Sequence, residues 1–313
     1  MLVSIIIPCY NYGKFIGQTL ENVIAQSYHN LEIIVIDDGS TDNTKDVVLA
    51  FIERDQRIQY FFQENRGLSA ARNFGIEKSS GYYVQFLDAD DALSPKKIQI
   101  QVEYLEKNTE IAICYVDPFY FKDQKGEQRF SNINLTDVSW MPKLTKEADK
   151  IETVELLLEG NIMPVNSPLV RRNVINTIGG FNAHLNSLED WDFWLRAAFS
   201  FKIVYLHHPE AYCLIRVHRT SMSQDRMRMI KAENEVRLLI DDYVRGQIDI
   251  TPSLKRKFLK KNNNYLKYIY SYFIRIKGLG AIHLLISILK KSGFWLLVRS
   301  YKKAIKDFKK EGI

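Results

Sequence analysis

Short runs of β-forming hydrophobic residues alternate with amphipathic segments through the first third of the chain. The continuous apolar runs predict strands at residues 3–8, 31–37, 58–62, 82–87 and 111–116. Between them, hydrophobic residues recur every three or four positions, as Ile98, Val102 and Leu105 do after Ser94, which predicts helices. Alternation of this kind with short connections is typical of a mostly parallel sheet with helices on both faces.

The alternation ends near residue 118. Residues 119–130 resemble a hairpin with a polar turn, and the polar, irregular residues 131–150 predict a mobile loop on the acceptor side. Regular patterns return at residues 154–158, 168–170, 203–206 and 211–217, with a helix beginning near Asp190, and from about Ser223 the pattern is helical. We therefore expect an α/β catalytic domain over residues 1–223, with halves 1–117 and 118–223, and a helical region over 224–313.

The bulk composition is that of a globular protein. The 313 residues are 46% hydrophobic and 26% charged, which is enough to build a core. Three cysteines lie far apart without metal-ligand spacing, which indicates reduced thiols in a cytoplasmic protein. The apolar start lacks a basic leader and reads as a first strand, and no uninterrupted apolar stretch of about 18 residues predicts a membrane span.

The charge is distributed unevenly along the chain. Residues 251–313 contain 16 Lys and Arg against Asp307 and Glu311, whereas the whole chain has a formal net charge of +6, so the first 250 residues are net negative.

The apolar runs at 265–274, 280–289 and 294–298 suit a helix lying on an anionic membrane surface. The alternative is a helical subdomain that packs on the catalytic domain or on a second subunit. No motif for nucleic-acid recognition is present.

Three carboxylates, Asp88, Asp90 and Asp91, follow the predicted strand at 82–87. Open α/β sheets bind ligands at the carboxyl ends of their strands. Carboxylates this close repel one another unless a cation lies among them, and a divalent cation shared with a phosphate is one solution. The alternative is a solvated loop that leads into a helix capped by Ser94.

Polar residues also follow the first two predicted strands. Tyr10 could stack on a nucleobase or cap the edge of the sheet. Asp37 and Asp38 could accept hydrogen bonds from a base or ribose, or form a turn and cap the next helix. A dinucleotide-binding turn would need three spaced glycines, and the sequence PCYNYG at 8–13 lacks them.

Small residues open the helix predicted at 68–76. The sequence GLSAA at 67–71 lets backbone N–H groups approach a phosphate or base, and Arg72 could pair with an anion or with a neighbouring side chain.

Four ordered motifs carry a family resemblance: IIIPCYN (5–11), VIDDGSTD (35–42), NRG with ARN (65–67 and 71–73) and FLDADD (86–91). Together they resemble the family 2 inverting glycosyltransferases of the GT-A fold, over about residues 1–220. The resemblance implies that a nucleotide, most often UDP, is held by Pro8, Tyr10, Asp37 or Asp38, Asn65, Arg72, Asp88 and Ala89. It also implies Mn²⁺ or Mg²⁺ on the diphosphate, held by Asp90 with Asp88.

Two later motifs extend the resemblance. GGFN (179–182) followed by LEDWD (188–192) is similar to the family's Glu-Asp motif at the acceptor site. It implies Asp190 as the general base with Glu189 beside it, although acids at a helix N-terminus also favour the helix dipole. RVHRTS (216–221) resembles a motif that closes over the metal and diphosphate. His218 would suit the metal and Arg216 or Arg219 a phosphate, the alternative being an ordinary surface loop.

The resemblance predicts metal-assisted transfer of one sugar from a nucleotide sugar to a glycan or lipid-linked acceptor, in bacterial surface polysaccharide synthesis. Processive members of the family carry Gln-x-x-Arg-Trp and membrane spans, which this sequence lacks. We expect a cytoplasmic enzyme that docks peripherally on the inner face of the membrane, and a homo-oligomer is left open. The alternatives are a nucleotidyltransferase and an inactive scaffold that binds nucleotide sugars.

Overall fold

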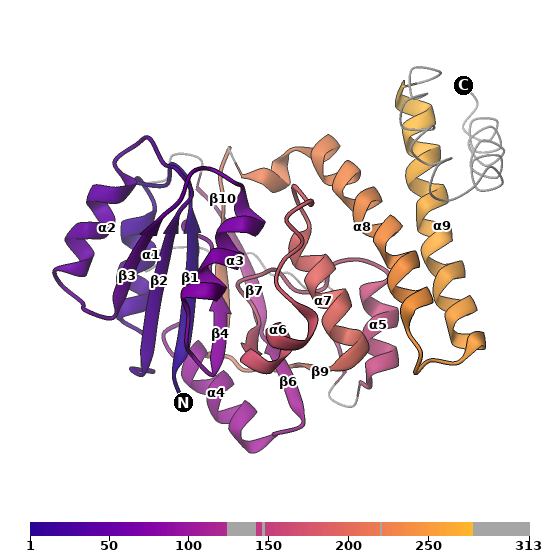
Figure 1. Ribbon diagram of the computed structural model, residues 1–313, viewed down its shortest axis with the longest axis horizontal. Helices are drawn as coiled ribbons and strands as arrows, with labels where there is room; N and C mark the ends of the chain where they lie inside the picture. Colours follow the sequence, from indigo (N-terminus) through magenta and orange to yellow (C-terminus); the bar gives the residue numbers. More distant parts are fainter. Residues whose placement is uncertain (124–141, 146–147, 220, 278–313) are drawn as a thin grey trace. The chain divides into compact units, whose positions relative to one another are not determined.

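A seven-stranded sheet runs through the first of two units into which the chain divides (Figure 1). The structure, a computed structural model, describes residues 1–123, 142–145, 148–219 and 221–277, without the side chains of 270–277. The first unit is Met1–Asp225 and the second begins at Arg226. In spatial order, the strands are β3 (Ile58–Phe62), β2 (Leu31–Asp37), β1 (Val3–Cys9), β4 (Tyr83–Phe86), β8 (Leu169–Arg171), β6 (Ile111–Tyr115) and β9 (Lys202–Tyr205).

Every pairing in this sheet is parallel except those of β8, which is antiparallel to β4 and to β6. The predicted mostly parallel α/β sheet is therefore confirmed. Because β8 is the single reversal, the other six strands point the same way and their carboxyl ends share one edge. That edge carries the residues that follow β1, β2 and β4, which include candidate site residues predicted from the sequence.

The helices of the first unit cover both faces of the sheet (Figure 1). They are α1 (Ile16–Ile24), α2 (Thr44–Ile52), α3 (Leu68–Lys78), α4 (Lys97–Lys107), α5 (Lys150–Leu157), α6 (Arg172–Ile178) and α7 (Glu189–Ser200). Within β1, Ile5 and Ile7 pack with Leu20 of α1, while Ile6 faces Gly75 of α3. A Cβ on Gly75 would lie 2.3 Å from Ile6 Cγ2, so the missing side chain lets α3 approach the sheet.

Burial on both faces explains the sequence of β1. All seven of its residues are buried, so its apolar run is continuous instead of alternating. A fully buried Ile side chain contributes about 1.5–3 kcal/mol, so this strand anchors the sheet from which the candidate site extends.

A smaller sheet places β10 (Tyr212–Val217) between β5 (Ala92–Leu93) and β7 (Asp117–Lys122). The hairpin predicted at 119–130 is wrong for its first arm, because residues 119–121 lie in β7, which pairs in parallel with β10. The reason is a distant apolar contact: Phe121 packs with Ala92 and Leu214. Residues 124–130, and most of the loop predicted at 131–150, lie outside the described residues; α5 already begins at Lys150.

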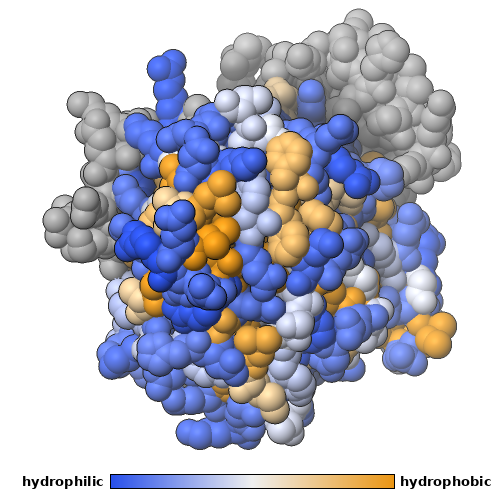
Figure 2. Space-filling view, turned by 60° about the vertical axis from the view of Figure 1, so that its left-hand side comes forward, coloured by the Kyte–Doolittle hydropathy of each residue, from blue (hydrophilic) through white to orange (hydrophobic). Residues whose placement is uncertain are grey.

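One surface of the molecule is shown in Figure 2, turned toward the side that carries α2 and β3. Hydrophobic residues form several separate patches there, surrounded by hydrophilic ones. Leu49 of α2 and Phe62 of β3 are among the exposed large hydrophobic residues, at 41% and 58%. Exposed hydrophobic residues scattered among hydrophilic ones are ordinary on a globular protein.

The second unit contains two long helices, α8 (Arg226–Gly246) and α9 (Pro252–Lys277). A polar contact joins them: Asn262 Nδ2 donates to the Arg237 carbonyl at 2.7 Å and to Asp241 Oδ1 at 2.9 Å, and the Arg237 guanidinium lies 4.2 Å from the Tyr265 ring centre. In the part of the chain that the structure describes, no helix combines the length and hydropathy of a membrane span. The apolar runs predicted at 280–289 and 294–298 lie outside the described residues.

Candidate active site

The acidic loop, residues 88–91, leaves the carboxyl end of β4 and enters β5. The Asp88 side chain is 34% exposed, whereas Asp90 and Asp91 are buried. Burial raises the pKa of Asp90, and burial together with the charges of Asp90 and Asp88 raises the pKa of Asp91. Bound positive charge would relieve this strain between like charges, so the loop is chemically suited to a divalent cation.

His218 comes to this loop from β10. Its Nε2 lies 2.8 Å from Asp90 Oδ2, and its ring stacks on Phe15 with 5.0 Å between ring centres. A nitrogen and a carboxylate oxygen that converge in this way match the donor types that Mn²⁺ accepts. Among the described residues no group of three His, Cys, Asp or Glu side chains is arranged to hold a metal ion. A cation at Asp90 and His218 would therefore need further ligands from water or from a substrate phosphate.

Arg216 supports the acidic loop from within the protein. It is 2% exposed, its Nε donates to the Asp90 carbonyl at 3.0 Å, and its Nη2 donates to Gln18 Oε1 at 3.0 Å. Its Nη1 forms an ion pair with Asp123. The phosphate role predicted for Arg216 would require these contacts to break, whereas Arg219, the other candidate, is exposed.

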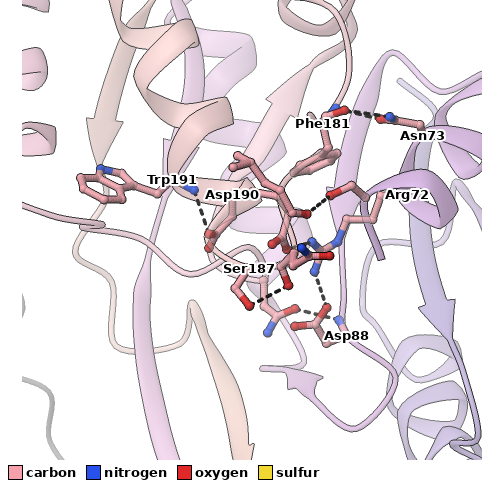
Figure 3. A network of polar contacts seen from close by, with 12 residues as sticks. Arg72, Asn73, Asp88, Phe181, Ser187, Asp190 and Trp191 are labelled. Atoms are coloured by element: carbon pink, nitrogen blue, oxygen red, sulfur yellow. Dashed lines mark hydrogen bonds and ion pairs between the residues drawn. The ribbon is translucent and has the colours of Figure 1, made fainter. Parts of the chain in front are cut away.

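Arg72 of α3 joins two acids from different parts of the chain (Figure 3). Its Nη2 lies 2.7 Å from Asp88 Oδ1, and its Nη1 pairs with Glu189, the first residue of α7. Arg72 is 1% exposed, and its Nε is buried without a hydrogen-bond partner. A buried guanidinium is stable only when paired, so this contact ties the acidic loop to the beginning of α7.

Asp190 follows in the first turn of α7. Its oxygens accept hydrogen bonds from Asn161 Nδ2 at 2.9 Å. They also accept one from the Trp191 backbone N–H at 2.8 Å (Figure 3). Burial, followed by the charge of Glu189, raises the pKa of Asp190 to about 7. A carboxylate with such a pKa can take up a proton at neutral pH, as a general base must.

The turn into α7 is strained. Leu188 has φ of 58°, a left-handed conformation that a leucine rarely adopts. Strain of this kind persists only where the surrounding structure enforces it, and it clusters at functional sites. Leu188 directly precedes Glu189 and Asp190, the first two residues of α7.

The predicted nucleotide side lies at the ends of β1 and β2. Asp37 accepts hydrogen bonds from Ser40 N–H at 2.8 Å and Tyr60 OH at 2.7 Å, and Asp38 accepts from Gly67 N–H at 2.8 Å. Asp37 therefore shapes a local turn, whereas Asp38 holds the distant loop before α3, and neither caps the next helix, α2. A nucleotide role for either stays a prediction. Tyr10, at 45% exposure, is accessible at the same edge.

Gly39 and Asn65 fit together on this side. Gly39 has φ of 82°, and a Cβ there would lie 2.9 Å from the Asn65 backbone nitrogen. A glycine is needed at this position, so Asn65 stays close to the end of β2. Pro8 precedes the last residue of β1, and Ala89 is buried within the acidic loop.

Two asparagines at this site were not predicted. Asn161 contacts Asp190, and Asn166 contacts both Asp88 and Asp91. Both lie in the segment between α5 and β8, far along the chain from the acidic loop. A single asparagine in an irregular stretch has no periodicity or motif by which it could be found.

Comparison with known proteins identifies the family. Residues 4–168 match the family described as Glycosyl transferase family 2, so the chain belongs to this family and is a glycosyltransferase. A glycosyltransferase of Haemophilus influenzae is 29% identical over 85% of this chain and 98% of its own. One from Rickettsia typhi is 31% identical over 74% of this chain and 68% of its own.

Solved structures support the fold. TarS of S. aureus in complex with UDP-GlcNAc superimposes with a TM-score of 0.71 at 18% identity, covering 99% of this chain and 92% of that one. A mannosyltransferase of Pyrobaculum calidifontis in complex with GDP-Man and Mn²⁺ gives a TM-score of 0.59 at 17% identity, over 97% and 87%. The GT-A fold predicted from the four motifs is confirmed.

The raised pKa of Asp190 allows its role as the general base to be tested. Because a base must be deprotonated to act, kcat/KM for nucleotide-sugar turnover is expected to rise as the pH increases through about 7. Asp190→Asn should lower kcat by about 10²–10⁴ and abolish this pH dependence, while nucleotide affinity, measured by calorimetry, stays unchanged.

Glu189→Gln is the matched control. Removing the Glu189 charge removes one cause of the raised Asp190 pKa, so the rise in kcat/KM should move to lower pH. Loss of turnover in Glu189→Gln together with retained turnover in Asp190→Asn would show that the base is Glu189.

Proposed function

We propose that this glycosyltransferase is inverting and metal-assisted, and that it moves one sugar from a nucleoside diphosphate sugar to a hydroxyl of a glycan or lipid-linked acceptor. We infer a UDP-sugar as the favoured donor and bacterial surface polysaccharide as the product. One observation carries the proposal: Arg72 holds the acidic loop and the beginning of α7 at the same sheet edge. The UDP-GlcNAc complex of the structurally similar TarS supports the choice of donor.

Inversion requires one carboxylate on the side opposite the leaving group. Asp190 suits this role, because it contacts Asn161 and Trp191 and lies outside the acidic loop. As the acceptor oxygen bonds to the anomeric carbon, Asp190 takes the hydroxyl proton. The bond from that carbon to the diphosphate oxygen breaks, and the diphosphate leaves with the electron pair.

The acidic loop would bind the diphosphate through a cation. Asp90 and His218 provide an oxygen and a nitrogen that converge, and Asp88 is accessible beside them, so these residues fit Mn²⁺ or Mg²⁺. When bound, such a metal offsets the negative charge that develops on the leaving diphosphate. Tyr10 would stack on the base, with Asn65 and Asp37 or Asp38 beside it.

A nucleotidyltransferase is the weaker candidate. It would need free backbone N–H groups after β1 to cradle a triphosphate. Here the N–H groups of Asn11, Tyr12 and Gly13 already donate to Ser40 Oγ, Thr44 Oγ1 and Asp42 Oδ2, at 2.8, 3.0 and 3.0 Å. An inactive scaffold is disfavoured because it would not need a base with its pKa near 7.

The metal assignment predicts a loss on substitution of Asp90. Wild-type protein should bind UDP more tightly with Mn²⁺ than with a chelator, and Asp90→Ala should abolish this difference, since it removes one of two converging ligands. Asp46→Ala, an exposed acid on α2, is the control and should bind as the wild type does. Equal UDP affinity of the wild type in Mn²⁺ and in chelator would contradict the proposal.

The basic second unit suggests how a lipid-linked acceptor is reached. We infer that α9 docks on an anionic membrane surface, since it carries eight Lys and Arg and no acidic residue. Each basic residue near such a surface contributes about 1 kcal/mol, so Arg256→Glu with Lys260→Glu should weaken binding to anionic vesicles at least about tenfold.

Sedimentation with vesicles at low and high salt measures this binding, which should weaken as salt rises. Lys45→Glu with Lys107→Glu, two exposed lysines of the first unit, is the matched control. Equal losses in both variants would point to net charge alone, and no binding by the wild type would exclude the membrane role.

A further inference from the structure

Asn166 bridges two residues of the acidic loop. Its side-chain Oδ1 accepts a hydrogen bond from the Asp88 backbone N–H at 2.8 Å, and its Nδ2 donates to Asp91 Oδ2 at 2.5 Å. Asn166 is 1% exposed and Asp91 is 2% exposed. The bridge therefore spans Asp90, the proposed metal ligand, from inside the protein.

Asp91 is also held at its second oxygen. The Arg216 backbone N–H donates to Asp91 Oδ1 at 2.7 Å, two residues before His218 in the same segment of chain. A continuous series of hydrogen bonds therefore runs from Arg216 N–H through Asp91 and Asn166 to Asp88 N–H. It connects the segment that carries His218 with the loop that carries Asp88 and Asp90.

The two ends of this series determine which of its side-chain atoms must donate a hydrogen bond and which must accept one. A backbone N–H can only donate, so the side chain at each end must accept. The contact between the two side chains then needs one donor and one acceptor. An acid at 91 with an amide at 166 meets this condition, and so does the reverse arrangement. Two amides would oppose donor to donor, and two ionised acids would oppose acceptor to acceptor.

Asn166 is itself anchored from behind. Its carbonyl accepts from Gln85 Nε2 at 2.9 Å, and Gln85 Oε1 accepts from the Nζ of Lys97 at 2.5 Å. Lys97 is fully buried, and its Nζ also donates to Gln101 Oε1 at 2.8 Å. A satisfied buried network of this kind fixes its members in place, so Asn166 cannot shift to accommodate a mispaired partner.

We propose that Asp91 and Asn166 are a positioning pair, which sets the placement of Asp88, Asp90 and His218 for the donor diphosphate and its metal. Asp91 itself binds neither, because it is buried and both of its oxygens accept hydrogen bonds from the protein. The inference rests on the proposed function and adds the residues that arrange its donor site.

The test compares four proteins: the wild type, Asp91→Asn, Asn166→Asp and the double variant that carries both changes. The double variant keeps every hydrogen bond of the series with its direction reversed between the two side chains, and it keeps the net charge. Ser167→Ala is the matched control, since Ser167 is a buried neighbour whose Oγ, among the described residues, bonds only Val116, at 2.5 and 3.0 Å. UDP affinity is measured by calorimetry with Mn²⁺ and with chelator, and thermal unfolding is measured without ligand.

Each single variant should lose about 10- to 100-fold in UDP affinity with Mn²⁺, the usual effect of removing a residue that orients metal ligands. Affinity in chelator should change much less. The double variant should recover most of the loss, and Ser167→Ala should unfold at a lower temperature while binding UDP with Mn²⁺ as the wild type does.

A double variant that folds but binds as poorly as the single variants would overturn the proposal, because Asp91 would then be needed as a carboxylate. Single variants that bind like the wild type would also overturn it. Where the single variants do not fold, the double variant decides, and its failure to fold counts against the pair. A wild type that does not bind UDP with Mn²⁺ refutes the proposed function instead, and unfolding temperatures still test the pairing.

Discussion

Repulsion among the carboxylates at the end of β4 is the constraint on which the site depends. Asp88, Asp90 and Asp91 lie within four positions, and each has a polar partner from elsewhere in the fold: Arg72 at Asp88, His218 at Asp90, and Asn166 with the Arg216 N–H at Asp91. These contacts come from α3, from the end of β10 and from the loop before β8. Segments that are distant in the sequence therefore meet at the acidic loop, and their contacts offset the repulsion among its carboxylates.

Arg72 connects the acidic loop with the beginning of α7. It pairs with Asp88 of the acidic loop and with Glu189 beside the proposed base, so one guanidinium contacts both the proposed donor side and the proposed acceptor side. The charge of Arg72 also lowers the pKa of Asp190, opposing burial and Glu189, which raise it. The pKa of the proposed base therefore depends on the same guanidinium that holds the acidic loop.

Much of this architecture could be predicted from local sequence. The apolar runs located β1, β2, β3, β4 and β6 because parallel strands buried on both faces have a continuous hydrophobic signature. The strand ends located the candidate residues for the same reason, since parallel strands share a carboxyl edge. The antiparallel pairing of β8 and the parallel pairing of β7 with β10 were not predicted, because they depend on contacts between residues far apart in sequence. The partners of Arg72 and Asp91 were missed likewise, since Glu189 and Asn166 are 117 and 75 residues away.

We propose a single displacement at one face of the anomeric carbon, with Asp190 on the side opposite the acidic loop. The configuration of the first-formed product tests it directly, because one displacement inverts the anomeric centre. Turnover of UDP-GlcNAc, whose sugar is α-linked, should be followed by proton NMR before mutarotation mixes the anomers. A single displacement predicts a β-configured product, whether the acceptor is a glycan or water. An α-configured first product would contradict it.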